Sequence, residues 1–311
     1  MATTISIWIL SDQKAGHENQ SVGLAEAIGR RQPVEMRRLK IDSNRFFWRN
    51  IADLKRELSG LPAPDLLIGA GHRTHVPLLW AKWVYQRPVV VLMKPTLTHR
   101  WFDLCIMPEH DVRRRHAESN VIVTSGVLNR IVPPAEKKSG RGLFLIGGPS
   151  KEFAWEPKPL LSSIQAIVAG HPDMEWRLTD SRRTPDGFIS RIVELLPQVQ
   201  TFSHAETPFG WMPEQLARAS TVWTTQDSVS MIYESLSSGA SVGLLPTPRR
   251  RQASRLSLGV DRLVGEGMVS RFTPEIATVP LPAPKRVLAE TDRCADEVLK
   301  RLFPGSDVGG S

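Results

Sequence analysis

A histidine lies in a polar, glycine-containing loop directly after the first apolar run of the chain. The run is TISIWIL, residues 4–10, and the loop after it contains Gly16 and His17. Histidine changes its charge near neutral pH and often acts as a general base. We therefore predict that His17 removes a proton from a hydroxyl, with His72 as the weaker alternative for that role. The structural alternative is that His17 only begins a helix over residues 18–30.

A second glycine-containing segment, GAGHRT at residues 69–74, follows another apolar run. Its glycines would let a helix begin close to a sheet, and the N–H groups at that helix start could receive an anion. The segment is a poor match to a dinucleotide-binding motif, because the third glycine is missing and no acidic residue is placed about 20 residues later.

A third segment, IGGPSKEF at residues 146–153, has the composition of a phosphate-binding turn. Gly147, Gly148 and Ser150 come directly after an apolar run. Backbone N–H groups of such a turn can surround a phosphate, while Lys151 neutralises charge. The segment is not a Walker motif, since GxxxxGK[ST] is absent. The alternative is a plain Gly-Gly turn.

The segment TTQDSVSMIYESLSSG, residues 224–239, predicts a helix with defined ends. Asp227 or Ser228 is a good N-cap, and Gly239 is a natural position for the helix to end. Ser228 and Ser230 lie at the helix N-terminus, where unpaired N–H groups and the helix dipole favour a diphosphate. Glu234 lies two turns along and could accept hydrogen bonds from a ribose. The alternative is an ordinary cap followed by a solvated glutamate.

Short apolar runs alternate with helix-length segments along most of the chain. The runs are almost continuously apolar, which is typical of parallel strands covered by helices on both faces. The predicted strands are 4–10, 65–70, 88–94, 103–108, 121–126, 143–148, 175–180, 199–203, 220–225 and 241–246, and the predicted helices are 18–30, 75–85, 157–169, 186–196, 212–219, 228–238 and 286–303.

The alternation is interrupted once, at LNRIVPPAEKKSGRG, residues 128–142, and then restarts. A stretch rich in proline, lysine and glycine is typical of a linker. We therefore predict an α/β fold of two doubly wound, Rossmann-like domains facing each other across a cleft. The predicted parts are an N-terminal α/β domain (1–130), a linker (131–141), a C-terminal α/β domain (142–285), a helix that packs back on the N-terminal domain (286–303) and a flexible tail (304–311).

The net charge is +8 and the pI is about 9.8, which favours anionic partners. The basic residues form short clusters at 113–115, 137–138, 182–183 and 249–251 rather than a long arm, so we expect no nucleic-acid partner. Cys105 and Cys294 have no zinc-ligand spacing around them, and a reducing cytosol fits them. No apolar run reaches the roughly 20 residues of a membrane span, and the N-terminus lacks the features of a signal peptide.

Four segments of the chain together resemble a known family. They are SDQKAGHENQSVGLAEA, GGPSKEFAW, TDSRRTP and TQDSVSMIYESLSSG, and they lie between residues 11 and 238. The last resembles the donor-binding segment of GT-B glycosyltransferases, and the whole chain is similar to the ELM1/GtrOC1 family of glycosyltransferase-like proteins, also called mitochondrial fission ELM1-like. Gln13 stands where the family usually has glycine, and Gln226 stands where an acidic residue is common.

The resemblance implies a nucleotide-sugar donor held mainly by the second domain and an acceptor held by the first. It implies no cofactor, because the nucleotide sugar is the substrate. It also implies a metal-independent site, in agreement with the absence of Asp-x-Asp. The implied donor-binding residues are Gly147, Gly148, Ser150, Lys151, Ser181, Arg182, Arg183, Asp227, Ser228, Ser230 and Glu234. The acceptor-side residues are Gly16, Asn19, Gln20, Gly71, His72 and Arg73.

Three functions fit these observations. The first is sugar transfer to a lipid-linked or cell-envelope saccharide acceptor by a cytoplasmic enzyme at the inner face of the membrane. The second is a non-catalytic adaptor on the same fold, and the third is a nucleotide-sugar epimerase. Contact with an anionic membrane would use the aromatic and basic residues of the first half, although core packing is the alternative for most of them. These residues are Phe46, Phe47, Trp48, Trp80, Trp83, Arg100, Trp101 and Arg113–Arg115.

Overall fold

The computed structural model describes residues 4–42, 47–112, 119–134, 140–208, 210–250 and 255–304. Its contacts divide the chain into two compact units. Unit 1 comprises Met1–Arg130 and Ala289–Ser311, and unit 2 comprises Ile131–Leu288. Phe46, Arg113–Arg115, Lys137, Lys138, Arg251 and all of the tail after Pro304 lie outside the described residues.

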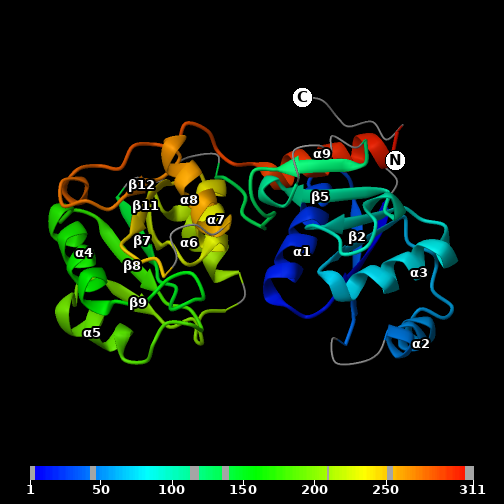
Figure 1. The fold of residues 1–311 in the computed structure, drawn as a ribbon, viewed down its shortest axis with the longest axis horizontal. Helices are drawn as coiled ribbons and strands as arrows, with labels where there is room; N and C mark the ends of the chain where they lie inside the picture. Colours follow the sequence, from blue (N-terminus) through cyan, green and yellow to red (C-terminus); the bar gives the residue numbers. More distant parts are fainter. Residues whose placement is uncertain are drawn as a thin grey trace. The chain divides into compact units, whose positions relative to one another are not determined.

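Unit 1 is built on a six-stranded, all-parallel sheet (Figure 1). In spatial order its strands are β2 (Val34–Lys40), β1 (Ile5–Ser11), β3 (Leu66–Ala70), β4 (Val89–Leu92), β5 (Leu104–Pro108) and β6 (Val121–Thr124). Its helices are α1 (Ala15–Gly29), α2 (Phe47–Glu57), α3 (His75–Tyr85) and α9 (Glu290–Leu302), with short 3-10 turns η1 (His72–Thr74), η2 (His99–Trp101) and η3 (Glu109–Asp111).

Alternate residues of these strands enter two separate cores. Ile7 and Ile9 of β1 belong to the cluster shared with α1 and α9, whereas Trp8 and Leu10 belong to the cluster shared with α2 and α3. Both faces of the sheet are therefore covered, which is why the strand sequences are apolar throughout rather than alternating.

Helix α9 belongs to unit 1 although it follows unit 2 in the sequence. Cys294 and Val298 of α9 are fully buried in the core that contains α1. The guanidinium group of Arg31 forms ion pairs with Asp292, at 2.9 Å, and with Asp296. Helix α9 is thus held by apolar packing on α1 and by partly exposed ion pairs with Arg31, two residues after the end of α1.

Unit 2 has a second six-stranded, all-parallel sheet. In spatial order its strands are β12 (Ser270–Arg271), β11 (Ser241–Leu245), β10 (Thr221–Thr225), β7 (Arg141–Leu145), β8 (Glu175–Thr179) and β9 (Gln200–Phe202). Its helices are α4 (Pro157–Gly170), α5 (Phe188–Leu195), α6 (Trp211–Arg218), α7 (Val229–Ser237) and α8 (Arg255–Gly265), with the 3-10 turn η4 (Ile276–Thr278).

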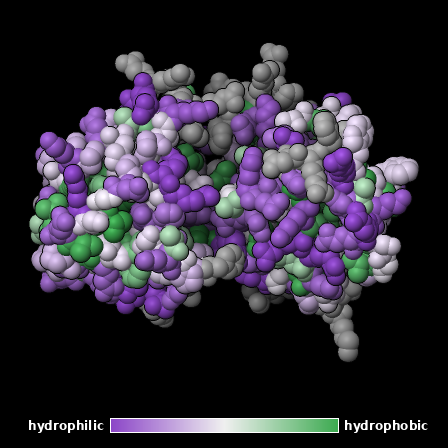
Figure 2. Space-filling view, turned by 90° about the horizontal axis from the view of Figure 1, so that it is seen from below, coloured by the Kyte–Doolittle hydropathy of each residue, from purple (hydrophilic) through white to green (hydrophobic). Residues whose placement is uncertain are grey.

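In unit 2, as in unit 1, alternate strand residues enter separate cores on the two faces of the sheet. Phe144 of β7 stacks on Trp176 of β8, with ring centroids 4.6 Å apart, on the face covered by α4 and α5. Leu143 and Leu145 point to the opposite face and pack with Leu216 of α6. The surface of the protein is different: on the face that Figure 2 shows, hydrophilic residues predominate and hydrophobic ones are scattered among them.

The predicted fold class, an α/β fold of two doubly wound domains, is confirmed. Several details differ. The first helix begins at Ala15 rather than at residue 18, and the last begins at Glu290 rather than at residue 286. The connection between the units is shorter than the predicted linker (131–141), because Ile131 packs in a core of unit 2 and Arg141 already belongs to β7. Unit 2 ends at Leu288 rather than at residue 285.

Candidate functional site

Each sheet has one point where the strand order reverses. In unit 1 the chain moves from β1 outward to β2 and then returns to β3 on the other side, so the reversal lies between β1 and β3. In unit 2 the series β7, β8, β9 runs one way and β10, β11, β12 runs the other, so the reversal lies between β7 and β10. Ligands of open α/β sheets bind beyond the carboxyl ends of the strands at such points. The candidate ligand-binding loops are therefore those that follow these four strands.

In unit 1 the loop after β1 holds a hydrogen-bonded Asp–His pair. The Nδ1 atom of His17 lies 3.0 Å and 2.9 Å from the two carboxylate oxygens of Asp12. The side chain of Asp12 is fully buried, whereas that of His17 is 20% exposed. The buried carboxylate therefore fixes the orientation of an imidazole that is still accessible from outside.

The loop after β3 covers this pair. A Cβ atom placed on Gly71 would lie 2.4 Å from Nδ1 of His17 and 2.8 Å from Oδ2 of Asp12. The φ angle of Gly71 is +89°, a conformation that residues with side chains rarely adopt. Gly71 is therefore required both by its backbone and by the close approach of the Asp–His pair.

The chemistry of this pair follows from its hydrogen bonding. When the imidazole is neutral, Nδ1–H donates to the Asp12 carboxylate and Nε2 carries the free lone pair. An oriented imidazole of this kind can accept a proton from a hydroxyl at Nε2, and the carboxylate then stabilises the imidazolium that forms. Sequence reasoning missed Asp12, although an aspartate five residues before a histidine, across a strand-to-helix turn, was a usable signal.

The other predicted residues of unit 1 lie around the same strand ends. Gln20 is buried, and its Nε2 group donates to the carbonyl oxygen of Gly16 at 3.1 Å and lies 3.7 Å from Sδ of Met93, just after β4. His72 and Arg73 are exposed in η1. Asn19 is partly buried in α1. Gln20 thus connects the start of α1 to the end of β4.

In unit 2 a buried carboxylate connects three loops. Asp227, after β10, accepts a hydrogen bond from the N–H of Gly148, after β7, at 3.0 Å. Its Oδ2 atom also lies 2.7 Å from the guanidinium group of Arg183, in the loop after β8. The Asp227 side chain is fully buried, whereas that of Arg183 is 42% exposed. Asp227 therefore holds one edge of a guanidinium group that reaches the surface.

The two glycines after β7 have a different role from the predicted one. The N–H of Gly147 donates to the Thr225 hydroxyl at 2.8 Å, and that of Gly148 donates to Asp227. Neither N–H group is free to surround a phosphate, so that part of the prediction is wrong. A Cβ atom on Gly147 would lie 2.3 Å from Oδ2 of Asp227, and one on Gly148 would lie 2.0 Å from the carbonyl oxygen of Arg183. The glycines instead allow the three loops to approach one another.

Two predicted hydroxyls are engaged within their own turns. Oγ of Ser150 accepts the N–H groups of Glu152 and Phe153, at 3.2 Å and 3.0 Å. Oγ of Ser181 accepts the N–H of Arg183 at 3.3 Å. These serines shape the loops that present the nearby side chains.

The predicted basic residues of these loops include two exposed ones, Lys151 and Arg182. From the 249–251 cluster, the guanidinium group of Arg249 is paired with Asp261 of α8 at 2.5 Å. Together with Arg271, it lowers the pKa of the Asp261 carboxyl below its ordinary value. Arg249 therefore stabilises the fold, and among the described residues the exposed positive charges of these loops are those of Lys151, Arg182, Arg183 and Arg250.

Helix α7 follows the reversal point of unit 2 directly. Ser228 is its N-cap residue, Ser230 is exposed in its first turn, and Glu234 is partly exposed one turn later. The helix stops before Gly239, whose φ angle is +75°, as the sequence predicted. The Ser228 side chain makes no capping hydrogen bond, so it does not occupy the first N–H groups of α7, which have no partner within the helix.

The described residues lack two kinds of feature. No three His, Cys, Asp or Glu side chains there are grouped so that they could hold a metal ion. No helix in that part of the chain is long and apolar enough to cross a membrane.

A family model described as Mitochondrial fission ELM1 matches residues 15–302 of this chain. The chain belongs to the mitochondrial fission ELM1 family. It is also 24% identical over 331 aligned positions to the uncharacterized protein RP120 of Rickettsia prowazekii, which covers 88% of this chain and 92% of RP120. The resemblance seen in the four sequence segments is thereby confirmed.

Solved structures of other proteins share the fold of this chain. UDP-GlcNAc 2-epimerase from Methanocaldococcus jannaschii matches with a TM-score of 0.57 at 10% identity, covering 96% of this chain and 100% of that one. A Staphylococcus aureus MnaA–UDP structure matches with a TM-score of 0.53 at 14% identity, over 96% and 89% of the two chains. At such identities the similarity establishes the fold alone.

Proposed function

We propose that this ELM1-family protein transfers a sugar from a nucleoside diphosphate sugar to the hydroxyl of a saccharide acceptor. Unit 2 binds the donor, and unit 1 supplies the base. The observation that carries the proposal is the Asp227–Arg183–Gly148 contact, which joins three strand ends at the reversal point of unit 2. A ligand at that point meets an anchored guanidinium group and the N-terminus of α7 together.

The donor's diphosphate fits these groups electrostatically. Guanidinium groups bind phosphate oxygens with two parallel hydrogen bonds, and Asp227 restrains Arg183 so that less side-chain freedom is lost on binding. The N-terminus of α7 adds unpaired N–H groups and the positive end of its dipole. Lys151 and Arg182 add positive charge from the same loops. Glu234 remains our candidate for the ribose hydroxyls.

One further feature of unit 2 supports a binding role. Oδ1 of Asp227 is buried and has no hydrogen-bond partner within the described residues. An unpaired buried acceptor costs about 1–3 kcal/mol, so a ligand group that donates a hydrogen bond would be favoured there. The charge of Arg183 on the same carboxylate offsets part of this cost.

We assign UDP as the first nucleotide to test, because the structures of similar fold include a protein described with UDP and an epimerase from Neisseria meningitidis described with UDP-GlcNAc. The reaction breaks the bond between the anomeric carbon and the diphosphate oxygen, and the electron pair leaves with UDP. The acceptor oxygen forms the new bond to the anomeric carbon. Its proton passes to Nε2 of His17, whose Nδ1–H is held by Asp12.

A second candidate function is epimerisation of the nucleotide sugar, which the fold similarity to UDP-GlcNAc 2-epimerases favours. Epimerisation changes the donor without an acceptor, whereas transfer releases UDP only when an acceptor is present. The adaptor function is less well supported, because Lys151, Arg183, Asp227 and Glu234 are all present.

The acceptor in our proposal is a lipid-linked or cell-envelope saccharide reached from the membrane surface. Trp48, Trp83 and Trp101 are 64%, 74% and 55% exposed, which is unusual for tryptophan and suits the membrane interface. Trp80 packs against a core of unit 1 instead. The side chain of Phe47, like Phe46 and Arg113–Arg115, lies outside the described residues.

The test begins with the binding of UDP and of UDP-GlcNAc, which is measured through the thermal unfolding of the protein. We expect a concentration-dependent rise in the unfolding temperature, and at least a tenfold weaker affinity in Arg183→Ala. Arg182→Ala is the comparison variant: Arg182 contributes positive charge from the same loop, but no described carboxylate anchors it, so we expect a smaller loss of affinity. Equal losses in both variants would contradict the role of the Asp227 anchor, and no binding of any nucleoside diphosphate would overturn the donor site.

The second step separates transfer from epimerisation. The protein is incubated with UDP-GlcNAc, with and without a saccharide acceptor, and the sugar is followed by proton NMR. Acceptor-dependent release of UDP supports transfer, and a new epimer without an acceptor supports the second candidate. His17→Gln is expected to lower the rate of transfer by about 10²–10⁴ without weakening UDP binding, as for loss of a general base.

A further inference from the structure

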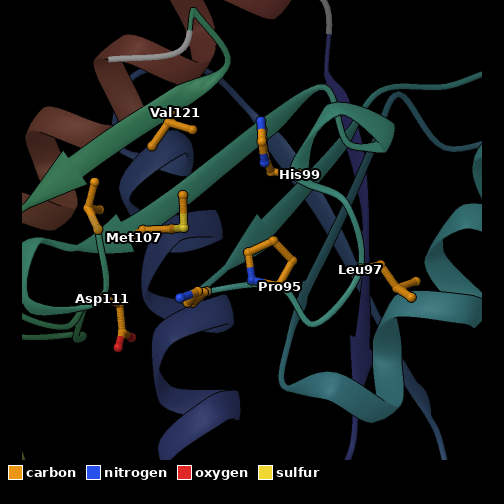
Figure 3. A pocket seen from close by; sticks show the side chains of 8 residues that line it. Pro95, Leu97, His99, Met107, Asp111 and Val121 are labelled. Carbon is orange, nitrogen blue, oxygen red and sulfur yellow. The ribbon is translucent and has the colours of Figure 1, made fainter. Parts of the chain in front are cut away.

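A cavity in unit 1 lies beside the carboxyl ends of β4 and β5 and is not used by the site described above. Its volume is about 390 Å³, which is within the range of small-molecule sites, about 300–1,000 Å³. Figure 3 shows the side chains that line it. They are Lys94, Pro95, Leu97, His99, Met107, Asp111, Val112 and Val121.

The walls of the cavity are an extension of an apolar core. Met107 belongs to the cluster between the sheet and helices α2 and α3, and Leu97, Val112 and Val121 pack against that cluster while remaining partly exposed. In the β5–β6 ladder Met107 pairs with Val123 and Cys105 pairs with Val121, so the walls come from neighbouring strands. Such walls favour an apolar group over water.

The polar side chains of the cavity are of three different kinds. Lys94 is exposed and makes no ion pair with the described residues. His99 and Asp111 contribute an imidazole and a carboxylate. The ammonium group of Lys94 supplies hydrogen-bond donors for hydroxyl groups. The lining therefore suits a molecule with an apolar part and a hydroxylated part.

The cavity is linked to the Asp12–His17 pair indirectly, through Met93 and Gln20. Lys94 follows Met93, and Sδ of Met93 lies 3.7 Å from Nε2 of Gln20. Gln20 in turn donates to the carbonyl oxygen of Gly16, next to His17. Met93 has a φ angle of +68°, a costly conformation for a residue with a side chain, of the kind that is concentrated at binding sites.

We propose, on the basis of the transfer reaction above, that this cavity binds the apolar chain of an amphiphilic saccharide acceptor. The chain lies against Met107, Val112 and Val121, and the sugar lies toward Lys94 and the strand ends that carry His17. The proposal defines the acceptor as a sugar bearing an apolar chain, rather than a free saccharide.

The test uses n-octyl β-D-glucoside below its critical micelle concentration and methyl β-D-glucoside as the chainless comparison. Protein labelled with ¹³C at the methionine methyl groups reports occupancy through the Met107 signal, which is assigned with Met107→Leu. We expect a saturable shift of this signal with octyl glucoside and none with methyl glucoside. Val121→Phe, which fills the cavity, is expected to weaken binding at least tenfold.

Val123→Phe is the matched control. Val123 lies two residues further along β6 on the same face of the strand, is 42% exposed and is not part of the cavity lining. This variant is expected to bind octyl glucoside as the parent does. Absence of a saturable Met107 shift, an equal shift with methyl glucoside, or equal effects of the two valine variants would each overturn the proposal.

The two proposals fail separately, because UDP binding is measured on the same samples. UDP binding without a Met107 shift would leave the donor site intact and remove the acceptor cavity. A Met107 shift without UDP binding would overturn the transfer reaction and leave a site for amphiphiles.

Discussion

We predict that the protein loses stability in mild acid because of His75, and the size of this loss follows from the structure. The residue is 1% exposed at the start of α3, its Nδ1 lies 3.1 Å from the Thr96 hydroxyl, and its ring packs against Phe102 with centroids 5.6 Å apart. Burial lowers the pKa of His75 from 6.5 to about 4, with a smaller contribution from the charge of His72. The folded protein therefore keeps this imidazole neutral well below pH 6.

The sign and size of the effect follow from proton linkage. Between pH 6.5 and about 4 the unfolded chain binds a proton at His75 and the folded chain does not, so the free energy of unfolding falls as the pH falls. Each step of one in pKa corresponds to about 1.4 kcal/mol. The loss is therefore about 3 kcal/mol when the pH has fallen from 7 to 4, and above pH 7 it is absent.

The assay is urea unfolding at several pH values between 7 and 4.5 for the parent and for His75→Gln, which can keep a hydrogen bond to Thr96. Hydrogen exchange of peptides from β3 and β4 assigns the transition to unit 1. We expect the parent to lose about 2–3 kcal/mol more than the variant over this range. The reasoning is refuted if both proteins lose stability equally, since other titrating groups are shared by the two.

Three further predictions concern single groups. Gly148→Ala forces a Cβ atom into the backbone of the neighbouring loop, so it should lower the free energy of unfolding by about 1–3 kcal/mol, measured by thermal unfolding, and abolish UDP binding. Gly259→Ala in α8 is the control: the space around Gly259 is open, so this variant should raise the free energy of unfolding by about 0.4–1 kcal/mol. Asp12→Asn should lower transfer by a factor comparable to that of His17→Gln while UDP affinity is unchanged, and a rate equal to the parent's would contradict the positioning role. Cys294, whose thiol pKa is raised to about 12 by burial, should resist iodoacetamide in the folded protein and react only after urea is added; rapid labelling at pH 8 would show that α9 opens.

The strands could be predicted from the sequence because almost all of them are apolar runs buried on two faces. Strand β2 was missed, since VEMRRLK lies at the edge of its sheet and exposes most of its charged side chains. Helix α2 was missed as well, because its apolar residues meet the core at only a few positions such as Leu54. Elements at the edge of a unit have weaker apolar sequence patterns than central ones, so they are harder to predict from the sequence.

The candidate sites were predictable as loops but not as contacts. Ligands of such sheets bind beyond strand ends, so Gly71, Gly148 and Asp227 could be predicted as site residues from the sequence. The sequence does not show the order of the strands, which places the ends of β7 and β10 next to each other. The pairing of Asp12 with His17 depends on a side-chain direction, and the internal use of the Gly147 and Gly148 N–H groups depends on where Thr225 and Asp227 come to lie. Both are consequences of tertiary packing.

The position of α9 has a consequence for how the protein folds as it is synthesised. Domains usually fold in the order in which they leave the ribosome. Here the core of unit 1 needs Cys294 and Val298, which are translated after the whole of unit 2. Unit 1 is therefore the first unit to be translated but the last to complete its folding. During that delay the face of α1 and the sheet that α9 will cover is open, and nascent-chain chaperones have a defined apolar surface to protect.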